Sequence, residues 1–283
     1  MMNILITGAN GQLGSELRAM STDYSNYTYF FTDYKELDIC KKECVEEFMA
    51  LHSIDLIINC AAYTAVDLAE DNPIDSDKIN HMGIANLGEV AEETGAGLIH
   101  FSTDYVFDGT SHKPYTEEDP TSAKSIYGIT KLAGERVLLA KCSNSMVIRT
   151  SWLYSSIGNN FVKAVIGKLS KDKKMNVIFD QIGTPTYARD LAAMVFTIIE
   201  KGIIPGVFHF SNEGVCSWYD FAKMIQRFAG IEGTITPITS DKFPSKAARP
   251  HFSVLDKSKI KETYEVEIPF WLDSLEDCIK QIK

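Results

Sequence analysis

Short apolar runs alternate with amphipathic segments through the first half of the chain. Four of the five runs are almost wholly apolar, which is typical of strands that are buried on both faces of a parallel sheet. The predicted strands cover Asn3–Thr7, Tyr27–Thr32, Asp55–Cys60, Leu98–Ser102 and Met146–Thr150. The predicted helices between them cover Gln12–Met20, Lys41–Leu51, Ile74–Glu93 and Ala123–Ala140. This alternation predicts an α/β fold with a doubly wound parallel sheet and right-handed crossovers.

The second half of the chain has a less regular pattern. Proline and glycine interrupt it repeatedly between residues 183 and 269, and these breaks predict a smaller unit that is rich in loops. The elements expected there are helices at Phe161–Leu169, Ala188–Glu200, Ser217 (as N-cap) to Phe228 and Trp271–Ile282, and strands at Asn176–Phe179 and Val207–Phe210. We therefore expect one domain over residues 1–151, rejoined by about 186–212, and a smaller C-terminal α/β domain over 152–185 and 213–283.

Composition and charge exclude several classes of protein. Hydrophobic residues make up 45% of the 283 positions and charged residues 23%, which is typical of a globular protein rather than a disordered one. The formal net charge of -10 argues against nucleic acid or an anionic membrane surface as the main partner. The six cysteines contain no C-x-x-C pair and predict no metal site, and we expect neither a signal peptide nor a membrane-spanning run. We therefore expect a cytoplasmic protein with reduced thiols.

Three glycines follow the first predicted strand and open the first predicted helix. Gly8, Gly11 and Gly14 have the spacing G-x-x-G-x-x-G. Glycines at such positions permit a tight turn, the approach of a pyrophosphate to the backbone and close packing of the helix on the sheet. Asp33 lies 19 residues beyond Gly14, after the second strand, and is either a ligand of the adenosine ribose or an ordinary polar residue at a strand end. The arrangement predicts a Rossmann-type domain that binds a dinucleotide.

Two Tyr-x-x-x-Lys pairs occur in the chain, and about one is expected by chance at this composition. Residues four apart share a helix face, so the ammonium can lie beside the phenol, lower its pKa and make it a general acid or base. Tyr127 and Lys131 follow the fourth strand, whose carboxyl end at Thr103 should border the ligand site of an open sheet. Tyr219 and Lys223 lie beyond the predicted sheet. We therefore predict that the first pair is functional, with Thr103 offered to a substrate carbonyl, and that the second is structural.

The glycine turn, Ser102-Thr103-Asp104 and Tyr127…Lys131 together resemble the extended short-chain dehydrogenase/reductase superfamily. Within it, residues 59–70 (NCAAYTAVDLAE) are similar to the NAAAYTxVDxAE signature of the dTDP-4-dehydrorhamnose reductase family. Further agreement lies at residues 102–109 (STDYVFDG), 127–135 (YGITKLAGE), 149–154 (RTSWLY), 217–222 (SWYDFA) and 248–250 (ARP). The resemblance covers nearly the whole chain. It implies a Rossmann domain interleaved with a C-terminal substrate domain.

The resemblance also implies a role for each matching residue. Tyr127 would donate a proton to a C4 carbonyl with Thr103 sharing that hydrogen bond, and Lys131 would hold the nicotinamide ribose and tune Tyr127. Thr103, Asp104 and Trp152 would contact the sugar. With the glycine turn and Asp33 included, the residues expected to contact the coenzyme are Gly8, Asn10, Gly11, Gln12, Leu13, Gly14, Asp33, Asp38, Ile39, Ala61, Ala62, Tyr63, Thr64, Tyr127 and Lys131.

The sequence departs from the family pattern in two places. Some family members bind magnesium at a dimer interface through several glutamates. Glu16 matches the first of these, but Arg189 stands where a second is expected, so a Mg2+ site is doubtful although the resemblance allows a homodimer. Cys60 replaces the more usual alanine, a change between small residues that we expect to have no effect.

The leading interpretation is an NAD(P)H-dependent reductase of a nucleotide-bound 4-keto-6-deoxy sugar, with dTDP-L-rhamnose as its product. Two alternatives stay open. One is a non-catalytic regulatory subunit similar to the beta subunit of methionine adenosyltransferase. The other is a nucleotide-sugar epimerase or dehydratase of the same superfamily, which would regenerate its coenzyme within each turnover.

The residues around the predicted ribose site bear on the choice of coenzyme. A 2′-phosphate needs a basic partner, whereas a free 2′-hydroxyl prefers a carboxylate. The turn from Thr7 to Gly14 contains no Arg or Lys, Asp33 occupies the ribose position, and Lys35 is the only nearby cation, partly offset by Glu36. We therefore expect NADH to be used at least as well as NADPH, although related reductases are often NADPH-dependent.

Overall fold

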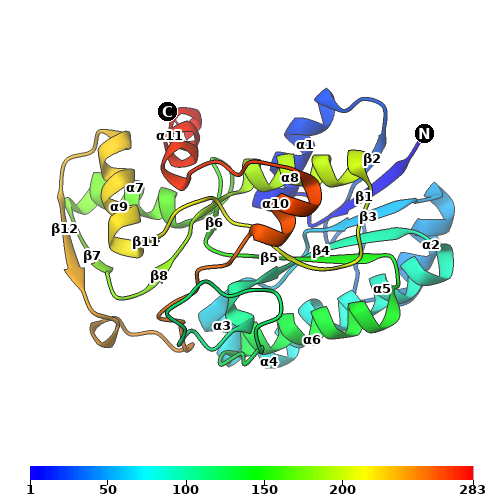
Figure 1. The fold of residues 1–283 in the computed structure, drawn as a ribbon, viewed down its shortest axis with the longest axis horizontal. Helices are drawn as coiled ribbons and strands as arrows, with labels where there is room; N and C mark the ends of the chain where they lie inside the picture. Colours follow the sequence, from blue (N-terminus) through cyan, green and yellow to red (C-terminus); the bar gives the residue numbers. More distant parts are fainter. Residues whose placement is uncertain (283) are drawn as a thin grey trace.

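A six-stranded parallel sheet lies at the centre of the larger lobe (Figure 1). The fold is that of a computed structural model, which describes residues 1–282. In spatial order the strands are β10 (Gly206–His209), β5 (Ser145–Thr150), β4 (Gly97–Thr103), β3 (Leu56–Asn59), β1 (Asn3–Thr7) and β2 (Thr28–Phe31). Every neighbouring pair is parallel, which confirms the predicted doubly wound fold. The strand order reverses between β1 and β3, and ligands of such sheets bind outside the carboxyl ends at this point.

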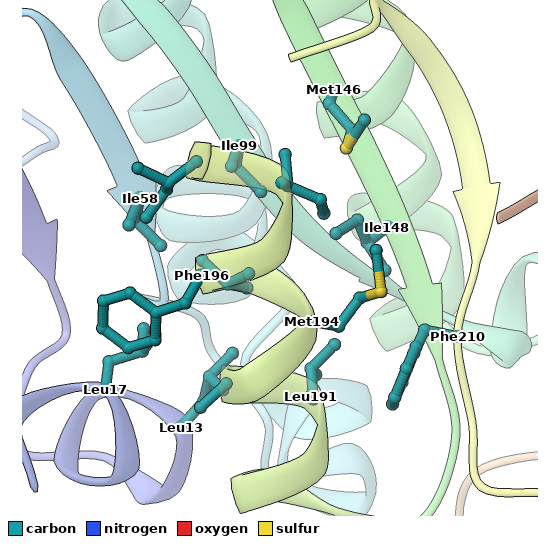
Figure 2. Close-up of a cluster of buried hydrophobic side chains, with 14 of the residues drawn as sticks. Leu13, Leu17, Ile58, Ile99, Met146, Ile148, Leu191, Met194, Phe196 and Phe210 are labelled. Atoms are coloured by element: carbon teal, nitrogen blue, oxygen red, sulfur yellow. The ribbon is translucent and has the colours of Figure 1, made fainter. Parts of the chain in front are cut away.

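Helices cover both faces of this sheet. Residues that alternate along a strand face opposite ways, so Ile4 and Ile6 pack in one core while Leu5 packs in the other. The first core lies under α1 (Gln12–Met20) and α8 (Ala188–Lys201), and Figure 2 shows Phe196 and Leu191 of α8 among side chains of α1 and the sheet. The second core lies under α2 (Lys42–His52), α5 (Gly83–Thr94) and α6 (Ile126–Lys141). Burial on both faces explains why the strands are apolar runs.

The smaller lobe has a core of its own, formed largely by aromatic and aliphatic residues of three helices. These helices are α7 (Phe161–Asp172), α9 (Trp218–Ala229) and α11 (Trp271–Ile282). The parallel pair β7 (Lys174–Ile178) and β12 (Thr234–Ile238) packs beside them. The segment that contains α8 and β10 returns to the larger lobe, where α8 packs on α1 and β10 pairs with β5.

Several elements lie outside the sequence-based expectation. Strand β12 contains Pro237, although we expected the prolines of this region to be breaks between elements. Both strands of its two-stranded sheet are edge strands, which tolerate a proline. The other additions are short: η1 (Ser21–Asp23), α3 (Val66–Asp71), η3 (Asp104–Val106), β6 (Leu153–Tyr154), β8 (Ile182–Gly183), β9 (Thr186–Tyr187), β11 (Cys216–Ser217), η4 (Ser240–Lys242) and α10 (Ser258–Tyr264). Elements of two to seven residues are too short to show a hydrophobic period.

The predicted helix over Ile74–Glu93 is not one regular helix. The structure divides it into α4 (Pro73–Asp77), a π-helical turn η2 (Lys78–Met82) and α5. The wide turn places the Asn80 side chain against the loop after β3, where it accepts from the Tyr63 N–H at 2.8 Å and donates to the Tyr63 carbonyl at 3.0 Å. Gly134 of α6 packs on the Asn80 carbonyl, where a Cβ would overlap it. Single π turns of this kind occur often beside functional sites.

None of the helices within residues 1–282 combines the length and the apolarity that a membrane crossing requires.

Candidate active site

A cavity of about 450 Å³ opens where the strand order reverses, beside the glycine turn. It is bounded by the ends of β1 and β3, by the segment after β2 and by the α4–η2 region. Eight of the predicted coenzyme residues line it: Gly8, Gly11, Asp33, Asp38, Ile39, Ala61, Ala62 and Tyr63. Segments that lie far apart in the sequence therefore meet in one concave site.

The glycine turn leaves no space for side chains at two of its positions. Gly8 has a φ of +60°, and a Cβ there would lie 2.6 Å from the Ala61 nitrogen. A Cβ on Gly14 would lie 2.5 Å from the Ala9 Cα and 2.6 Å from the Gly8 carbonyl oxygen. Gly14 thus lets α1 pack on the turn itself, whereas we expected it to bring the helix close to the sheet. At Gly11, the N-cap of α1, no side chain of residues 1–282 caps the helix.

Other predicted coenzyme residues near this turn have partners within the chain or lie outside the cavity lining. The Asn10 N–H donates to Asp33 Oδ2 at 3.1 Å, and Gln12 Oε1 accepts from the Asn160 amide at 2.9 Å. Leu13 packs in the core under α8, and Thr64 is exposed in the loop after β3. From Leu13, whose side chain is in the core, only backbone groups would face a ligand in the turn.

Asp33 is held at the rim of the cavity by two backbone groups. Its Oδ1 accepts from the Tyr34 N–H at 2.8 Å, and its Oδ2 accepts from Asn10. The expectation that Lys35 is the only nearby cation is wrong, because Lys78 of the π turn also lines the cavity. Asp33 and Lys78 line the same cavity although they lie far apart in the sequence, so the pattern around Asp33 gave no sign of this lysine.

Tyr127 and Lys131 lie on the first two turns of α6, against the carboxyl half of β4. Ser125 caps the helix by accepting from the Gly128 N–H at 3.2 Å. The Lys131 side chain is buried, and its ammonium donates to the Phe101 carbonyl at 2.6 Å and lies 3.2 Å from His100 Nε2. Figure 1 shows α6 running along the sheet below β4 and β5.

The pKa values of the pair reflect burial more than mutual attraction. Burial raises the pKa of the Tyr127 phenol to about 12, a hydrogen bond with Thr103 acts against this rise, and Asp104 adds to it. Burial lowers the pKa of Lys131 to about 8, opposed by the charge of Glu135. The expectation that Lys131 lowers the pKa of Tyr127 is therefore not met in this structure. Removal of the phenol from water outweighs the neighbouring cation.

Thr103 and Asp104 stand at the end of β4 beside Tyr127. The Thr103 hydroxyl donates to Asp104 Oδ1 at 2.9 Å and accepts from the Tyr105 N–H at 3.2 Å. Asp104 is buried, and burial raises the pKa of its carboxyl to about 6, against hydrogen bonds from Ser253 and Thr103. A carboxyl with this pKa changes its charge near neutral pH, directly beside the candidate proton donor.

Trp152 connects the end of β5 to the smaller lobe. Its backbone has a φ of +49°, which is unusual for a residue of this size. Its ring stacks on Trp218 of α9 with centroids 3.6 Å apart and planes inclined by 12°. Gly183 lies against the same ring, since a Cβ there would approach Trp152 Cε2 to 2.7 Å. The ring is therefore fixed between two segments of the smaller lobe, at the junction with the sheet.

The second Tyr-x-x-x-Lys pair lies in the smaller lobe, away from the carboxyl ends of the sheet strands. Tyr219 and Lys223 belong to α9, which packs with α7 and α11 in the smaller lobe. Lys223 is exposed, and its ammonium bonds to Gln226 at 3.1 Å.

The residues considered for magnesium also have partners within the chain. Glu16 is buried and accepts from the Ser155 hydroxyl, and Arg189 is exposed. Among residues 1–282, no three His, Cys, Asp or Glu side chains form a cluster that could hold a metal ion.

Sequence reasoning assigned no role to five residues that line the cavity or contact a predicted site residue: Asn59, Lys78, Asn80, His100 and Trp218. Asn59 and His100 are polar residues in apolar strands, a signal that was available in the sequence. Lys78 and Trp218 carry no such signal, because only the fold brings them to the site.

The arrangement can be compared with known proteins. The model of the RmlD substrate-binding domain family matches residues 2–283. The chain belongs to the RmlD family. A dTDP-4-dehydrorhamnose reductase of Aggregatibacter actinomycetemcomitans is 37% identical over 289 residues, with 98% of each chain covered. The spore coat polysaccharide biosynthesis protein SpsK of Bacillus subtilis is 35% identical, with 99% of this chain and 98% of SpsK covered.

Solved structures of RmlD-type proteins agree with the whole fold. A dTDP-4-dehydrorhamnose reductase of Clostridium acetobutylicum has 42% identity and a TM-score of 0.94 over 99% of both chains. A dTDP-4-dehydrorhamnose reductase of Bacillus anthracis, in complex with NADP, has 36% identity and a TM-score of 0.96 over 99% of this chain and all of that one. A dTDP-glucose 4,6-dehydratase of Bacillus anthracis, at 19% identity and a TM-score of 0.84, shares the fold alone.

Proposed function

We propose that this protein reduces the C4 keto group of dTDP-4-dehydro-L-rhamnose to dTDP-L-rhamnose with a nicotinamide dinucleotide. The observation that carries the proposal is the pair Tyr127 and Lys131 on α6, with the lysine buried against β4 and the half-buried tyrosine beside Thr103. The same sheet carries the cavity at the glycine turn. The reductases of the RmlD family to which the chain is similar over nearly its full length support the same choice of substrate.

The cavity fits a dinucleotide. Gly8 and Gly11 present bare backbone where a Cβ would fill the turn, and the first N–H groups of α1 point to the same side. Helix N-termini and glycine turns bind pyrophosphate in this way. Asp33, Asp38 and Ala62 would hold the adenosine half, and Lys131 with Tyr127 the nicotinamide ribose. When bound, the reduced nicotinamide supplies a hydride to the keto carbon.

The chain's own residues would handle the proton and the sugar. Tyr127 donates its phenolic proton to the carbonyl oxygen as negative charge develops there. Thr103 shares the hydrogen bond, since its hydroxyl already lies beside both Tyr127 and Asp104. Trp152, fixed by Trp218, forms a wall against the sugar. Residues 1–151 with 186–212 would bind the coenzyme, and residues 152–185 with 213–283 would bind the nucleotide sugar.

The decisive test is coenzyme oxidation with dTDP-4-dehydro-L-rhamnose as substrate and NMR assignment of the product. Stoichiometric release of oxidised coenzyme with formation of dTDP-L-rhamnose supports the proposal. Coenzyme binding without turnover would instead indicate a regulatory subunit, and conversion without net coenzyme oxidation would indicate an epimerase or a dehydratase.

We also propose that NADH serves at least as well as NADPH. The Asp33 carboxylate is fixed at the cavity rim, and its repulsion of a 2′-phosphate should cost on the order of 1 kcal/mol at an effective dielectric near 20. Lys78 acts in the opposite direction from the π turn. The test is kcat/KM for both coenzymes in the wild type, Asp33→Ala and Lys78→Ala. A tenfold or greater preference for NADPH that Asp33→Ala leaves unchanged contradicts the proposal.

A further inference from the structure

A chain of four buried polar side chains runs through the sheet to the Lys131 ammonium. It consists of Thr7 at the end of β1, Asn59 at the end of β3, His100 in β4 and Lys131 on α6. His100 has no exposed surface, and Thr7, Asn59 and Lys131 are 1–2% exposed. Buried polar groups of this kind require partners, and here each serves as the partner of the next.

The distances along the chain are those of hydrogen bonds. Thr7 Oγ1 lies 2.6 Å from Asn59 Oδ1, Asn59 Nδ2 lies 2.9 Å from His100 Nδ1, and His100 Nε2 lies 3.2 Å from Lys131 Nζ. The same ammonium donates to the Phe101 carbonyl at 2.6 Å. The lysine is therefore held at two points of β4, by a backbone oxygen and by a ring nitrogen on the preceding residue.

The chemistry of an ammonium determines how the ring must be protonated. A charged lysine can only donate, so Nε2 must accept, and the single proton of a neutral imidazole then lies on Nδ1. Burial, and next the charge of Lys131, hold the pKa of His100 well below its usual range, so the ring is neutral at working pH. In the structure the Asn59 amide presents Nδ2 to the ring and to the Ala61 carbonyl, and its Oδ1 accepts from Thr7. The Nδ1–H tautomer requires this amide to be turned so that Oδ1 faces the ring, and the Thr7 hydroxyl allows the turn because it can donate or accept.

We propose that His100 is a positioning residue for Lys131. His100 Nε2 accepts a hydrogen bond from the ammonium, in the tautomer that Asn59 and Thr7 support. This bond keeps the lysine charged and directed toward the coenzyme ribose. The role of His100 rests on the proposed function only through the contact of Lys131 with the coenzyme. Neither the spacing of Tyr127 and Lys131 nor their shared helix face requires His100.

Other charged groups around Lys131 have partners of their own. Glu135, one turn along α6, is paired with the buried Arg149 of β5 at 2.8 Å. Glu70 of α3 accepts from the Ile126 N–H at the start of α6, and Asp104 accepts from Thr103. Asp75 and Lys78 face the cavity from α4 and η2. The side chain within hydrogen-bond distance of the ammonium is that of His100.

The experiment uses two amide variants that each reproduce one ring nitrogen. His100→Gln places an acceptor near the position of Nε2, whereas His100→Asn keeps the contact with Asn59 and loses the acceptor that faces Lys131. The dissociation constant of NADH is measured by fluorescence titration between pH 6 and 10 in both variants, the wild type and Lys131→Met.

Wild-type affinity should fall with a midpoint near pH 8, where Lys131 loses its charge. In His100→Asn the midpoint should move down by about one pH unit, the effect of one lost hydrogen bond to a charged group. His100→Gln should keep the wild-type midpoint, and Lys131→Met should give no such transition. An unchanged midpoint in His100→Asn overturns the proposal, because a merely structural role would change affinity without moving the midpoint.

A second measurement needs no variant. The ring ¹⁵N shifts of His100 in the wild-type protein at pH 7 should report the Nδ1–H tautomer, and an Nε2–H tautomer would overturn the proposal. Turnover of dTDP-4-dehydro-L-rhamnose is assayed separately. A protein with the predicted tautomer and pH shift but no turnover refutes the proposed function and leaves the role of His100 intact.

Discussion

The two Tyr-x-x-x-Lys pairs have the same spacing on two helices and opposite surroundings. On α6, Lys131 is 2% exposed and is held by the Phe101 carbonyl and His100. On α9, Lys223 is exposed and bonds to a glutamine one turn away. The α6 pair contacts the carboxyl half of β4, whereas α9 packs its apolar face into the core of the smaller lobe.

The difference shows what spacing can and cannot determine. Four residues along a helix place two side chains on one face, but the dielectric around them and their partners depend on what that face packs against. Burial raises the pKa of Tyr127 and lowers that of Lys131, because both side chains lie where the charged form is poorly solvated. In such an environment a hydrogen bond to a charged group is stronger than in water. Groups with pKa values perturbed by burial are typical of functional sites.

The largest expected effect separates the two tyrosines. Tyr127→Phe removes the proposed proton donor and should lower kcat by about 10²–10⁴-fold while coenzyme binding persists. Tyr219→Phe is the matched control and should leave kcat nearly unchanged. Steady-state kinetics and coenzyme titration measure both. A greater loss of turnover in Tyr219→Phe would reverse the choice between the pairs.

The two lysines provide the second comparison. Lys131→Ala removes a charged donor from the ribose site and should weaken coenzyme binding by about 10–100-fold. Lys223→Ala should have no effect on binding. Lys131→Arg should not restore affinity fully, because a planar guanidinium cannot occupy the place of a compact ammonium between Phe101 and His100. Equal dissociation constants for wild type and Lys131→Ala would remove the ribose role.

A substitution of Asp104 measures how much the burial of a carboxyl at the carboxyl end of β4 lowers the stability of the fold. Its folded pKa of about 6 lies above the usual value of 3.8, so the folded state binds more protons between these pH values and stability falls as the pH rises through them. Asp104→Asn should therefore be more stable than the wild type at pH 8, by roughly 1–3 kcal/mol, with the difference shrinking toward pH 4. Urea unfolding at both pH values measures this. A pH-independent difference would mean that the pKa of Asp104 is the same in the folded and unfolded states, which contradicts the prediction.

The smallest expected effect shows how the smaller lobe contributes to the site. Trp218→Leu removes the ring that stacks on Trp152 and should raise KM for the sugar by about 3–10-fold, with coenzyme affinity unchanged. Tyr219→Leu, the neighbouring aromatic on α9, is the control and should not change KM. A fall in coenzyme affinity in Trp218→Leu would indicate that α9 supports the whole fold rather than one wall of the site.

The local elements of this protein could be predicted from its sequence. Strands buried on both faces form apolar runs, so β1, β3, β4 and β5 were evident within one or two residues. Gly8 was identified by its place between a strand and a helix, and it has the positive φ that the turn requires. Asp33, chosen from its spacing, and Ala61 and Tyr63, implied by the family resemblance, also line the cavity.

Features that depend on contacts between distant segments were not predictable. In the π turn at 78–82, the Asn80 side chain hydrogen-bonds to the backbone of Tyr63, and Gly134 packs on the Asn80 carbonyl. The hydrophobic periodicity of residues 74–93 does not predict these contacts. Lys78 reaches the cavity for the same reason.

The sequence by itself determined which helix faces and strand ends carry reactive groups, because side-chain periodicity is a local property of the backbone. Only the tertiary structure decided that Lys131 meets His100, that Asp104 is buried and that the pKa of Tyr127 rises rather than falls. The physical reason is that burial and electrostatic partners come from segments distant in sequence, and in a low-dielectric interior these set the charge of every titratable group.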